Sequence, residues 1–482
     1  MVNFVNRDKN DIFGIPFLGF IFKNRIFLRI LQTIILGLFL YAIYFGFINP
    51  TKEENLFTTG LFWGLFWPFF MVVTLSTLGR VFCGICPHGF IGKYITKFGL
   101  KKKMPKKLAN PFIGVILLFI GWWFVYYMFP GLFKTPYASA LFFLIMTIVA
   151  VVFYYIYDEM AYCKYICPIG TMTKVYSKVS FTKLETYTDN CQSCKTFDCA
   201  SACSYNLKPF TFAKKNSMED CTLCMDCSTA CEAVAFKFKA PSNGLVKKFK
   251  ANKAEVWALI LITAAISITM SFHHALGRSA IFEDFFWTKT ARYFEGILNF
   301  GSIDTVGLFA FLYAVVISIS LMIGGMYIAS KIMKVDYEKT FYTLGYAISP
   351  LFIVGGLSHV GEFFFYSYAH NITNGFNQAF SLGLDKMAPL ASRKDAWVHI
   401  FNIFNHIAYI WAFILVAIRM KQLDTKRYLK ILAFPFASAL IVFYMSLNFY
   451  KAYVFSTYGA NKGGHNHSSH QMKPNTNQYK AQ

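Results

Sequence analysis

Residues 191–203 read CQSCKTFDCASAC, and residues 221–231 read CTLCMDCSTAC. Each stretch carries four cysteines, and the second has the Cys-x2-Cys-x2-Cys-x3-Cys spacing of bacterial ferredoxins with two [4Fe–4S] clusters. In that pattern three cysteines of one run wrap one cluster, and the fourth reaches the other cluster. We therefore predict two [4Fe–4S] clusters with crossed ligands. One would be held by Cys191, Cys194, Cys199 and Cys231, and the other by Cys203, Cys221, Cys224 and Cys227.

The first run departs from this pattern, because four residues and not two precede its third cysteine. A pair of zinc ribbons is the alternative interpretation, since Cys-x2-Cys pairs also bind zinc through thiolates. Zinc-binding pairs normally lie two and two across a long spacer. Here four cysteines fall within 11 to 13 residues, and the run is repeated once. The spacing therefore favours clusters over zinc.

Four further cysteines form a second repeated motif, in which each pair ends in Cys-Pro. The pairs are Cys83 with Cys86, followed by Pro87, and Cys163 with Cys167, followed by Pro168. Two pairs at matching membrane depth could form one four-thiolate site for a third cluster or for Cu(I), which prefers thiolate ligands. A redox-active dithiol and small apolar residues without a redox role are the other interpretations.

The rest of the sequence indicates a membrane protein. The 482 residues are 56% hydrophobic, 19% aromatic and only 15% charged. Apolar runs of about 20 residues span the hydrocarbon core as helices whose backbone groups are all paired internally. We predict about nine such helices, at 27–48, 57–79, 112–132, 137–157, 254–272, 306–329, 341–368, 396–418 and 431–450.

The basic loops predict the orientation of these helices. Residues 93–107 hold seven lysines and no acid, and the loops 331–340 and 419–430 are also basic. Lys and Arg concentrate in cytoplasmic loops, so we expect these loops, the N-terminus and residues 158–253 in the cytoplasm of a bacterial inner membrane. Structural disulfides are not expected there. The first helix, without a small-residue cleavage site before it, would be retained as an anchor.

The predicted fold is thus an all-α polytopic membrane protein with an inserted cytoplasmic ferredoxin-like α+β domain. Residues 1–180 would form a four-helix membrane region with both Cys-Pro motifs, residues 181–250 the domain with two [4Fe–4S] clusters, and residues 251–455 a five-helix membrane region. Residues 456–482 would be a flexible periplasmic tail rich in histidine. Metal scavenging and a plain polar tail are both open interpretations of that tail.

Ionisable residues within predicted membrane helices are costly and by default functional. His359 and Glu362 lie three apart on one helix face, and His399 and His406 share a face of the next helix with Asn402. We consider His359, His399 and His406 as ligands of a haem b or a copper ion. A hydrogen-bonded network without metal and a quinone or proton site are the alternatives. Helix 254–272 is followed by a further pair, His273 and His274.

The order of motifs resembles the membrane polyferredoxins grouped around the NapH quinol dehydrogenase component, the NosR regulator and the CcoG oxidase accessory protein. Those families share paired Cys-x2/3-Cys-Pro motifs at helix ends followed by a double ferredoxin domain, and the resemblance covers residues 25–240. It implies cytoplasmic [4Fe–4S] clusters that transfer electrons at the membrane, with quinol oxidation or metal-ion reduction as activities. Residues 254–451 add five helices that the short NapH-like proteins lack, and nothing resembles the extracytoplasmic domain of CcoG or the flavin domain of NosR.

We therefore expect an iron–sulfur electron carrier that passes electrons from cytoplasmic clusters to the membrane or periplasmic side. The acceptor would be a copper or iron ion reduced for uptake or oxidase assembly. Alternatives are a quinol dehydrogenase module that feeds a periplasmic reductase, and a metal transporter or chaperone with a regulatory ferredoxin domain. Expected partners are membrane lipid and a redox protein or quinol. The excess positive charge, +23, lies in every second loop, as expected of loops on the cytoplasmic side of a membrane, so nucleic-acid binding is not expected. The sequence also has no nucleotide-binding motif.

Overall fold

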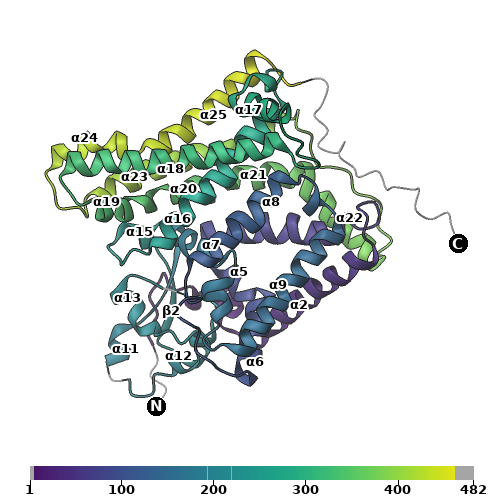
Figure 1. The fold of residues 1–482 in the computed structure, drawn as a ribbon. Helices are drawn as coiled ribbons and strands as arrows, with labels where there is room; N and C mark the ends of the chain where they lie inside the picture. The colour runs from purple at the N-terminus through teal and green to yellow at the C-terminus, as the bar shows by residue number, and fades with distance from the viewer. Residues whose placement is uncertain (1–4, 193, 219, 462–482) are drawn as a thin grey trace.

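A computed structural model describes residues 5–192, 194–218 and 220–461 of the chain (Figure 1). Within those residues, seven helices are long and apolar enough to cross a membrane. They are Arg25–Ile48, Phe57–Thr77, Pro136–Ile156, Lys253–Arg278, Thr305–Met333, Tyr337–Phe380 and Ala396–Met420. The protein is therefore a helical, multi-pass membrane protein, as the sequence predicts.

The other two predicted crossings are less regular. Residues Phe112–Met128 form a shorter apolar helix. The last predicted crossing lies in a pair of helices, α24 (Arg427–Ala437) and α25 (Ala439–Thr457), which are bent by 44° at their junction. Pro435 lies inside α24, where the ring removes one backbone hydrogen bond and clashes with the preceding turn, so the bend has a local cause. The count of nine crossings stays a prediction.

The first membrane region is packed through aromatic rings and close helix crossings. The rings of Phe62 and Phe143 stack with centroids 3.9 Å apart. A Cβ on Gly46 would lie only 2.6 Å from Ala140, so glycine is what lets the first and fourth helices approach at that point. The elements are α2 (Arg25–Ile48), α3 (Phe57–Thr59), η2 (Gly60–Val72), α4 (Val73–Thr77), α7 (Phe112–Leu118), η3 (Phe119–Phe124), α8 (Val125–Met128) and α9 (Pro136–Ile156).

The second membrane region is built around α18 (Thr305–Met333), which packs along α24 and along the short helix α17 (Phe286–Glu295). A Cβ on Gly325 would lie within 2.3 Å of the Phe436 carbonyl, so α18 and α24 meet there in backbone contact. The remaining elements are α16 (Lys253–Ile262), η8 (Thr263–Ile268), η9 (Met270–Ala275), η10 (Leu276–Arg278), α19 (Tyr337–Leu344), α20 (Ser349–Ile353), α21 (Gly356–Phe363), η13 (Phe364–Tyr368), α22 (Ala369–Phe380), η14 (Ala396–Asn402) and α23 (Ile403–Met420).

The ferredoxin-like segment, residues 181–250, is a small α+β unit. Its strands β1 (Thr182–Thr186) and β2 (Val234–Phe238) pair antiparallel, with Leu184 opposite Phe236. The N-terminal residues add to the edge of this sheet, since the Phe238 amide donates to the Asn10 carbonyl at 2.8 Å. Between the strands lie the short helices α11 (Thr188–Gln192), α12 (Asp198–Ser201), α13 (Phe212–Lys215) and α14 (Asp226–Ala230).

The basic loops gather at one end of the helix bundle, as their charge predicts. The Lys102 amide donates to the Ile156 carbonyl, Gln422 donates to the Val246 carbonyl, and Lys253 pairs with Glu338. We call this the basic end, and in Figure 1 the ferredoxin-like segment lies on the same side as α15 (Asn243–Val246) and α19. The other end, where α17 and α22 lie, is the opposite end. That the basic end faces the cytoplasm stays a prediction.

Charged side chains hold the ferredoxin-like segment against the first membrane region. Asp226 accepts hydrogen bonds from Arg29 at 3.0 Å and from Lys93 at 2.6 Å. Lys174 pairs with Asp220, one residue before Cys221. Because Asp220 directly precedes the second cysteine run and Asp226 lies inside it, the ion pairs position that run on the membrane region.

Backbone contact completes this docking. Gly84 lies so close to the loop that follows Cys221 that a Cβ would fall 2.6 Å from the Leu223 carbonyl oxygen and 3.0 Å from that of Thr222. Both neighbours are backbone atoms, which cannot move aside as a flexible side chain can. Only glycine therefore permits this approach.

We expect Gly84→Ala to loosen the docked loop, because overpacking of this kind costs about 1–3 kcal/mol. Hydrogen–deuterium exchange should report faster exchange at residues 221–224 in the variant. Gly37→Ala is the control, since nothing lies within 4 Å of a Cβ at Gly37, and it should leave exchange unchanged. Equal protection of the loop in Gly84→Ala and in the unaltered protein would contradict the docking described here.

Candidate iron–sulfur site

The cysteines of the ferredoxin-like segment gather in two sets. Burial raises the pKa of the Cys199 thiol to about 11, and the neighbouring thiols of Cys231, Cys191 and Cys194 raise it further. These four are the set that the crossed pattern predicts for one cluster. Although Cys231 belongs to the second run, it lies with the first.

The second set forms around Cys227. Burial raises the pKa of this thiol, and the thiols of Cys221, Cys224 and Cys203 act in the same direction. Cys199 of the first set also contributes, so the two sets are neighbours. Residues in the left-handed region shape the loops around them, namely Phe197 (φ 51°) before α12, and Leu223 (φ 54°) and Met225 (φ 62°) before α14. Non-glycine residues seldom adopt this conformation outside functional turns.

The two Cys-Pro motifs have the same local structure. Cys83 lies in α5 (Val81–Ile85), and α6 (Pro87–Phe98) begins after Cys86. Cys163 lies in η5 (Tyr162–Ile166), and α10 (Gly170–Tyr176) begins three residues after Cys167. A glycine three residues after the second cysteine packs against the carbonyl of the first cysteine in both motifs. A Cβ on Gly89 would lie 3.2 Å from the Cys83 oxygen, and a Cβ on Gly170 would lie 2.8 Å from the Cys163 oxygen.

The four thiols of these motifs form one site, which we call the four-cysteine site. Burial raises the pKa of Cys86 to about 12, with further contributions from Cys83 and Cys163. Burial also raises the pKa of Cys167, which interacts with the other three thiols. Four neighbouring thiolates repel one another and need a compensating positive centre. The iron of a cluster, or a soft metal ion, would supply it, so the thiolate chemistry suits such a group, although in the described residues no three of these side chains are arranged around a single ion.

Tyrosine and threonine hydroxyls surround the four-cysteine site. The Tyr154 hydroxyl lies 2.9 Å from the Cys163 sulfur, and the Cys83 thiol donates to the Thr173 hydroxyl at 3.5 Å. Hydrogen bonds to cluster sulfurs are one of the means by which a protein sets a reduction potential. These contacts were not predicted from the sequence, because Tyr154 and Thr173 lie outside both motifs.

Two buried residues connect the four-cysteine site with the second cysteine set. The Arg80 side chain, 3% exposed, donates to the Cys221 carbonyl at 3.2 Å and also hydrogen-bonds to Cys83. The Tyr205 hydroxyl hydrogen-bonds to Cys163 and to Thr222. Their only signal in the sequence is their position, three residues before Cys83 and two residues after Cys203.

A cavity of about 300 Å³ adjoins the four-cysteine site, and we call it the thiol cavity. Its wall includes all four cysteines, the polar groups of Arg80, His88 and Thr173, and many aromatic rings. The His88 imidazole lies 2.8 Å from the Thr147 hydroxyl, and burial lowers the pKa of His88 to about 4, so the ring is neutral. The aromatic lining residues are Phe39, Phe62, Trp63, Phe66, Trp67, Phe82, Trp122, Phe142, Phe143 and Tyr162.

The thiol cavity reaches the outside of the helix bundle through its rim. Leu117, 42% exposed, and Ile145, 53% exposed, both line it. Gly121 also lines it and is exposed, with nothing within 4 Å of a Cβ placed there. Because these residues belong to apolar helices, we expect the rim to face lipid.

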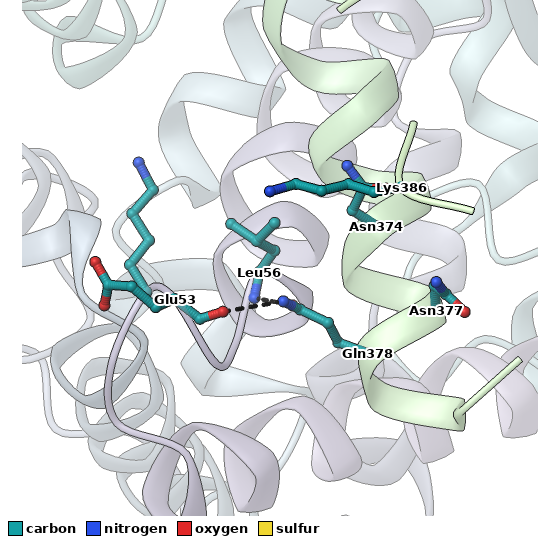
Figure 2. A pocket seen from close by; sticks show the side chains of 7 residues that line it. Glu53, Leu56, Asn374, Asn377, Gln378 and Lys386 are labelled. Atoms are coloured by element: carbon teal, nitrogen blue, oxygen red, sulfur yellow. Dashed lines mark hydrogen bonds between the residues drawn. The ribbon is translucent and has the colours of Figure 1, made fainter. Parts of the chain in front are cut away.

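A second cavity, of about 460 Å³, lies at the opposite end and holds none of the cysteines (Figure 2). It lies between the loop after α2 and helix α22. The Leu56 amide donates to the Gln378 side chain at 2.7 Å, and Gln378 donates to the Glu53 carbonyl at 3.1 Å. The lining residues are Lys52, Glu53, Leu56, Asn374, Asn377, Gln378 and Lys386.

The three histidines predicted as metal ligands have separate partners. His359 lies 3.3 Å from the Tyr368 hydroxyl. The ring of His399, whose side chain is 54% exposed, lies 3.6 Å from the Glu362 carboxylate, and the ring of His406 faces Phe449. Among the described residues, no three His, Cys, Asp or Glu side chains are arranged to hold a single metal ion. The histidines of the predicted tail, from His465 on, lie outside the described residues.

Comparison with known proteins supports the iron–sulfur assignment. A family model described as a 4Fe-4S binding domain matches residues 59–106 and 139–185, the segments that contain the two Cys-Pro motifs. Two uncharacterized proteins of Methanocaldococcus jannaschii are similar. One is 26% identical over 45% of this chain and 96% of its own length, and the other is 27% identical over 37% and 71%. No solved structure matches.

The helices and the matched domain define an iron–sulfur protein of the membrane. The matched segments do not include the eight cysteines of the ferredoxin-like segment, so the ligands of their clusters stay predictions. The relatives have no assigned function, so the resemblance to the NapH, NosR and CcoG group also stays a prediction.

The crossed arrangement can be tested through pairs of substitutions. Cys194→Ala and Cys231→Ala should each remove one cluster, and the double variant should lose no more iron than either single variant. Combining Cys194→Ala with Cys203→Ala should remove two clusters. Iron and acid-labile sulfide per chain, measured anaerobically, distinguish the outcomes, and greater loss in the first double variant than in its parents would contradict the crossed sets.

Proposed function

We propose that this protein carries electrons between [4Fe–4S] clusters in the ferredoxin-like segment and a third [4Fe–4S] cluster in the four-cysteine site. The observation that carries the proposal is the direct bridge from one site to the other, in which Arg80 contacts both Cys83 and the Cys221 carbonyl. The family match over both Cys-Pro motifs supports a cluster there in preference to Cu(I). When bound, such clusters exchange single electrons at potentials that their surroundings set.

The protein's own charges suit this task. Thiolate-bound clusters carry net negative charge, and burial of such charge requires compensation. Arg80 provides a cation beside Cys83, and Lys93 interacts with the Cys224 thiol as well as with Asp226. These cations favour the more negative, reduced state of the nearby clusters.

The contacts also support an order of transfer. Cys199 of the first set neighbours Cys227 of the second, and Tyr205 spans from Thr222 beside the second set to Cys163 of the four-cysteine site. Electron transfer falls steeply with distance, so this sequence of neighbours is the path we assign. A soluble redox protein at the basic end, in the cytoplasm, would exchange electrons with the first set.

A quinone or quinol is the membrane partner that the thiol cavity supports best. Its wall is mostly apolar with a few polar groups that could orient a ligand, as in small-molecule sites. Arg80 Nε, which has no hydrogen-bond partner among the described residues, and the second ring nitrogen of His88 are the groups that could bond quinone oxygens beside the thiols, and the rim at Gly121 opens to the outside of the helix bundle. A lipid-soluble redox carrier could therefore enter from the bilayer and meet the four-cysteine site.

Copper or iron reduction at the opposite end has less support. It would require ligands there, and His359, His399 and His406 each engage different neighbours. Binding of haem b at these histidines, and metal transport through them, would also require the three rings to share a ligand. We therefore favour the quinol-linked function over the metal-ion reductase that the sequence first suggests.

Iron content and EPR of the anaerobic protein test the third cluster. We expect iron for three clusters per chain, and loss of one cluster in Cys86→Ala or Cys167→Ala while the signals of the other two remain. Iron for two clusters only, unaffected by these substitutions, would contradict a cluster in the four-cysteine site.

Arg80→Gln should lower the reduction potential of the cluster in the four-cysteine site by tens of millivolts. The reason is that loss of the cation disfavours the added electron, and a tenfold change in a one-electron equilibrium corresponds to about 59 mV. Redox titration followed by EPR measures the shift. Arg292→Gln is the control, because Arg292 pairs with Glu283 and Glu295 on the opposite end. Equal potentials in Arg80→Gln and the unaltered protein would show that Arg80 does not set the potential of this cluster.

Gly121→Trp should block the rim of the thiol cavity and slow reduction of the clusters by duroquinol about tenfold or more, while reduction by dithionite is unchanged. Gly37→Trp is the matched control, since Gly37 is also an exposed glycine of an apolar helix with no atom near its Cβ position. Stopped-flow absorbance of the clusters measures both rates. If duroquinol reduces the Gly121→Trp clusters as fast as those of the control, quinol does not enter at this rim.

A further inference from the structure

A continuous row of hydrogen bonds joins the two membrane regions near the opposite end. The Tyr126 hydroxyl of α8 lies 3.3 Å from His274 Nε2, His274 Nδ1 lies 3.3 Å from His273 Nδ1, and His273 Nε2 lies 3.0 Å from Asp304 Oδ2. The two histidines belong to η9, and Asp304 directly precedes α18. We call these four side chains the His–Asp chain.

One set of tautomers satisfies every contact in the His–Asp chain. Tyr126 donates to His274 Nε2, so His274 carries its proton on Nδ1 and donates it to His273 Nδ1. His273 then carries its proton on Nε2 and donates it to the Asp304 carboxylate. Each histidine accepts from one neighbour and donates to the next, which is the arrangement that moves protons by successive short transfers.

The chain is buried at His273 in its middle and partly exposed at Asp304, its end near the surface. His273 is 3% exposed, and the ring of Tyr127 lies 5.9 Å edge-on from the rings of both histidines. The Asp304 side chain is 16% exposed. Its other oxygen accepts from the Gly307 amide at 2.8 Å as the cap of α18, and Glu295 is a charged neighbour. Asp304 is therefore held in place where the chain meets water.

The inner end of the chain lies one ring away from the wall of the thiol cavity. The ring of Trp123 lies 5.6 Å from that of Tyr126 and 6.3 Å from that of Trp67, which lines the cavity. The indole N–H of Trp123 is buried and has no hydrogen-bond partner among the described residues. A buried N–H of this kind is normally satisfied by water or by a ligand.

We propose that the His–Asp chain conducts the protons of quinol oxidation from the thiol cavity to the opposite face of the membrane, an inference that rests on the proposed quinol function. Oxidation of one quinol to quinone breaks two O–H bonds and yields two electrons and two protons. The two electrons would pass one at a time through the four-cysteine site and the ferredoxin-like segment to an oxidised one-electron redox protein at the basic end, which they reduce. Each proton enters at Tyr126 and leaves from Asp304 to water, after which the histidines return to their starting tautomers. Electrons and protons thus leave on opposite sides.

Proteoliposomes of the full chain test the proposal, with pyranine in the lumen, duroquinol in the bilayer and ferricyanide outside. Ferricyanide does not cross the membrane, so only molecules with the basic end outward turn over. We expect acidification of the lumen in step with ferricyanide reduction. Asp304→Asn, which keeps the cap of α18, and His273→Gln should slow lumenal acidification and ferricyanide reduction about tenfold. Each variant should also lower the number of protons released into the lumen per ferricyanide reduced and change the solvent isotope effect on turnover.

The matched control is Asp336→Asn, because Asp336 caps α19 in the same way at the basic end and should leave both rates unchanged. Failure of duroquinol to reduce the clusters of the unaltered protein would overturn the proposed quinol function itself. Quinol oxidation with protons released outside the vesicle, or normal lumenal acidification in both Asp304→Asn and His273→Gln, would overturn the His–Asp chain and leave the quinol function standing. Cluster content of each variant, checked by EPR after dithionite, separates a blocked proton path from misfolding.

Discussion

Backbone contact at Gly84, together with the buried guanidinium of Arg80, holds the second cysteine run of the ferredoxin-like segment against the membrane helices. The rest of the redox arrangement depends on this contact, because it brings one set of ferredoxin cysteines next to the four-cysteine site. A side chain at Gly84 would separate them, and a neutral residue at Arg80 would leave neighbouring thiolates without a cation. Close approach and charge compensation therefore act at the same few residues.

The four-cysteine site lies between the ferredoxin-like segment and the apolar helices of the first membrane region. On one side lie Arg80 and Tyr205, which lead to the ferredoxin-like segment, and on the other lies an apolar, aromatic cavity that opens toward lipid. Polar groups are few in this cavity, so each of them can orient a ligand. The second membrane region adds the His–Asp chain, in which His274 contacts Tyr126 of the first region, and in the proposed function this contact links the second region to the same reaction.

Much of this was predictable from local patterns. The helices follow from apolar runs, the gathering of basic loops at one end follows from their charge, and the two thiol sets follow from cysteine spacing. The structure does not bring together the three histidines that the sequence suggests as metal ligands. His359, His399 and His406 share helix faces in sequence, but helix faces alone do not say which neighbour a face meets, and each ring has a different partner.

The sequence by itself determined the class of protein, because ligand spacing and hydrophobic length are local properties that need no knowledge of the fold. Only the tertiary structure decided which cysteines, rings and charges meet. Arg80, Tyr205, the thiol cavity and the row from Tyr126 to Asp304 each join segments that lie far apart in the chain, for example 148 residues between Tyr126 and His274. Such contacts depend on helix packing and close glycine crossings, which no local pattern in one sequence encodes.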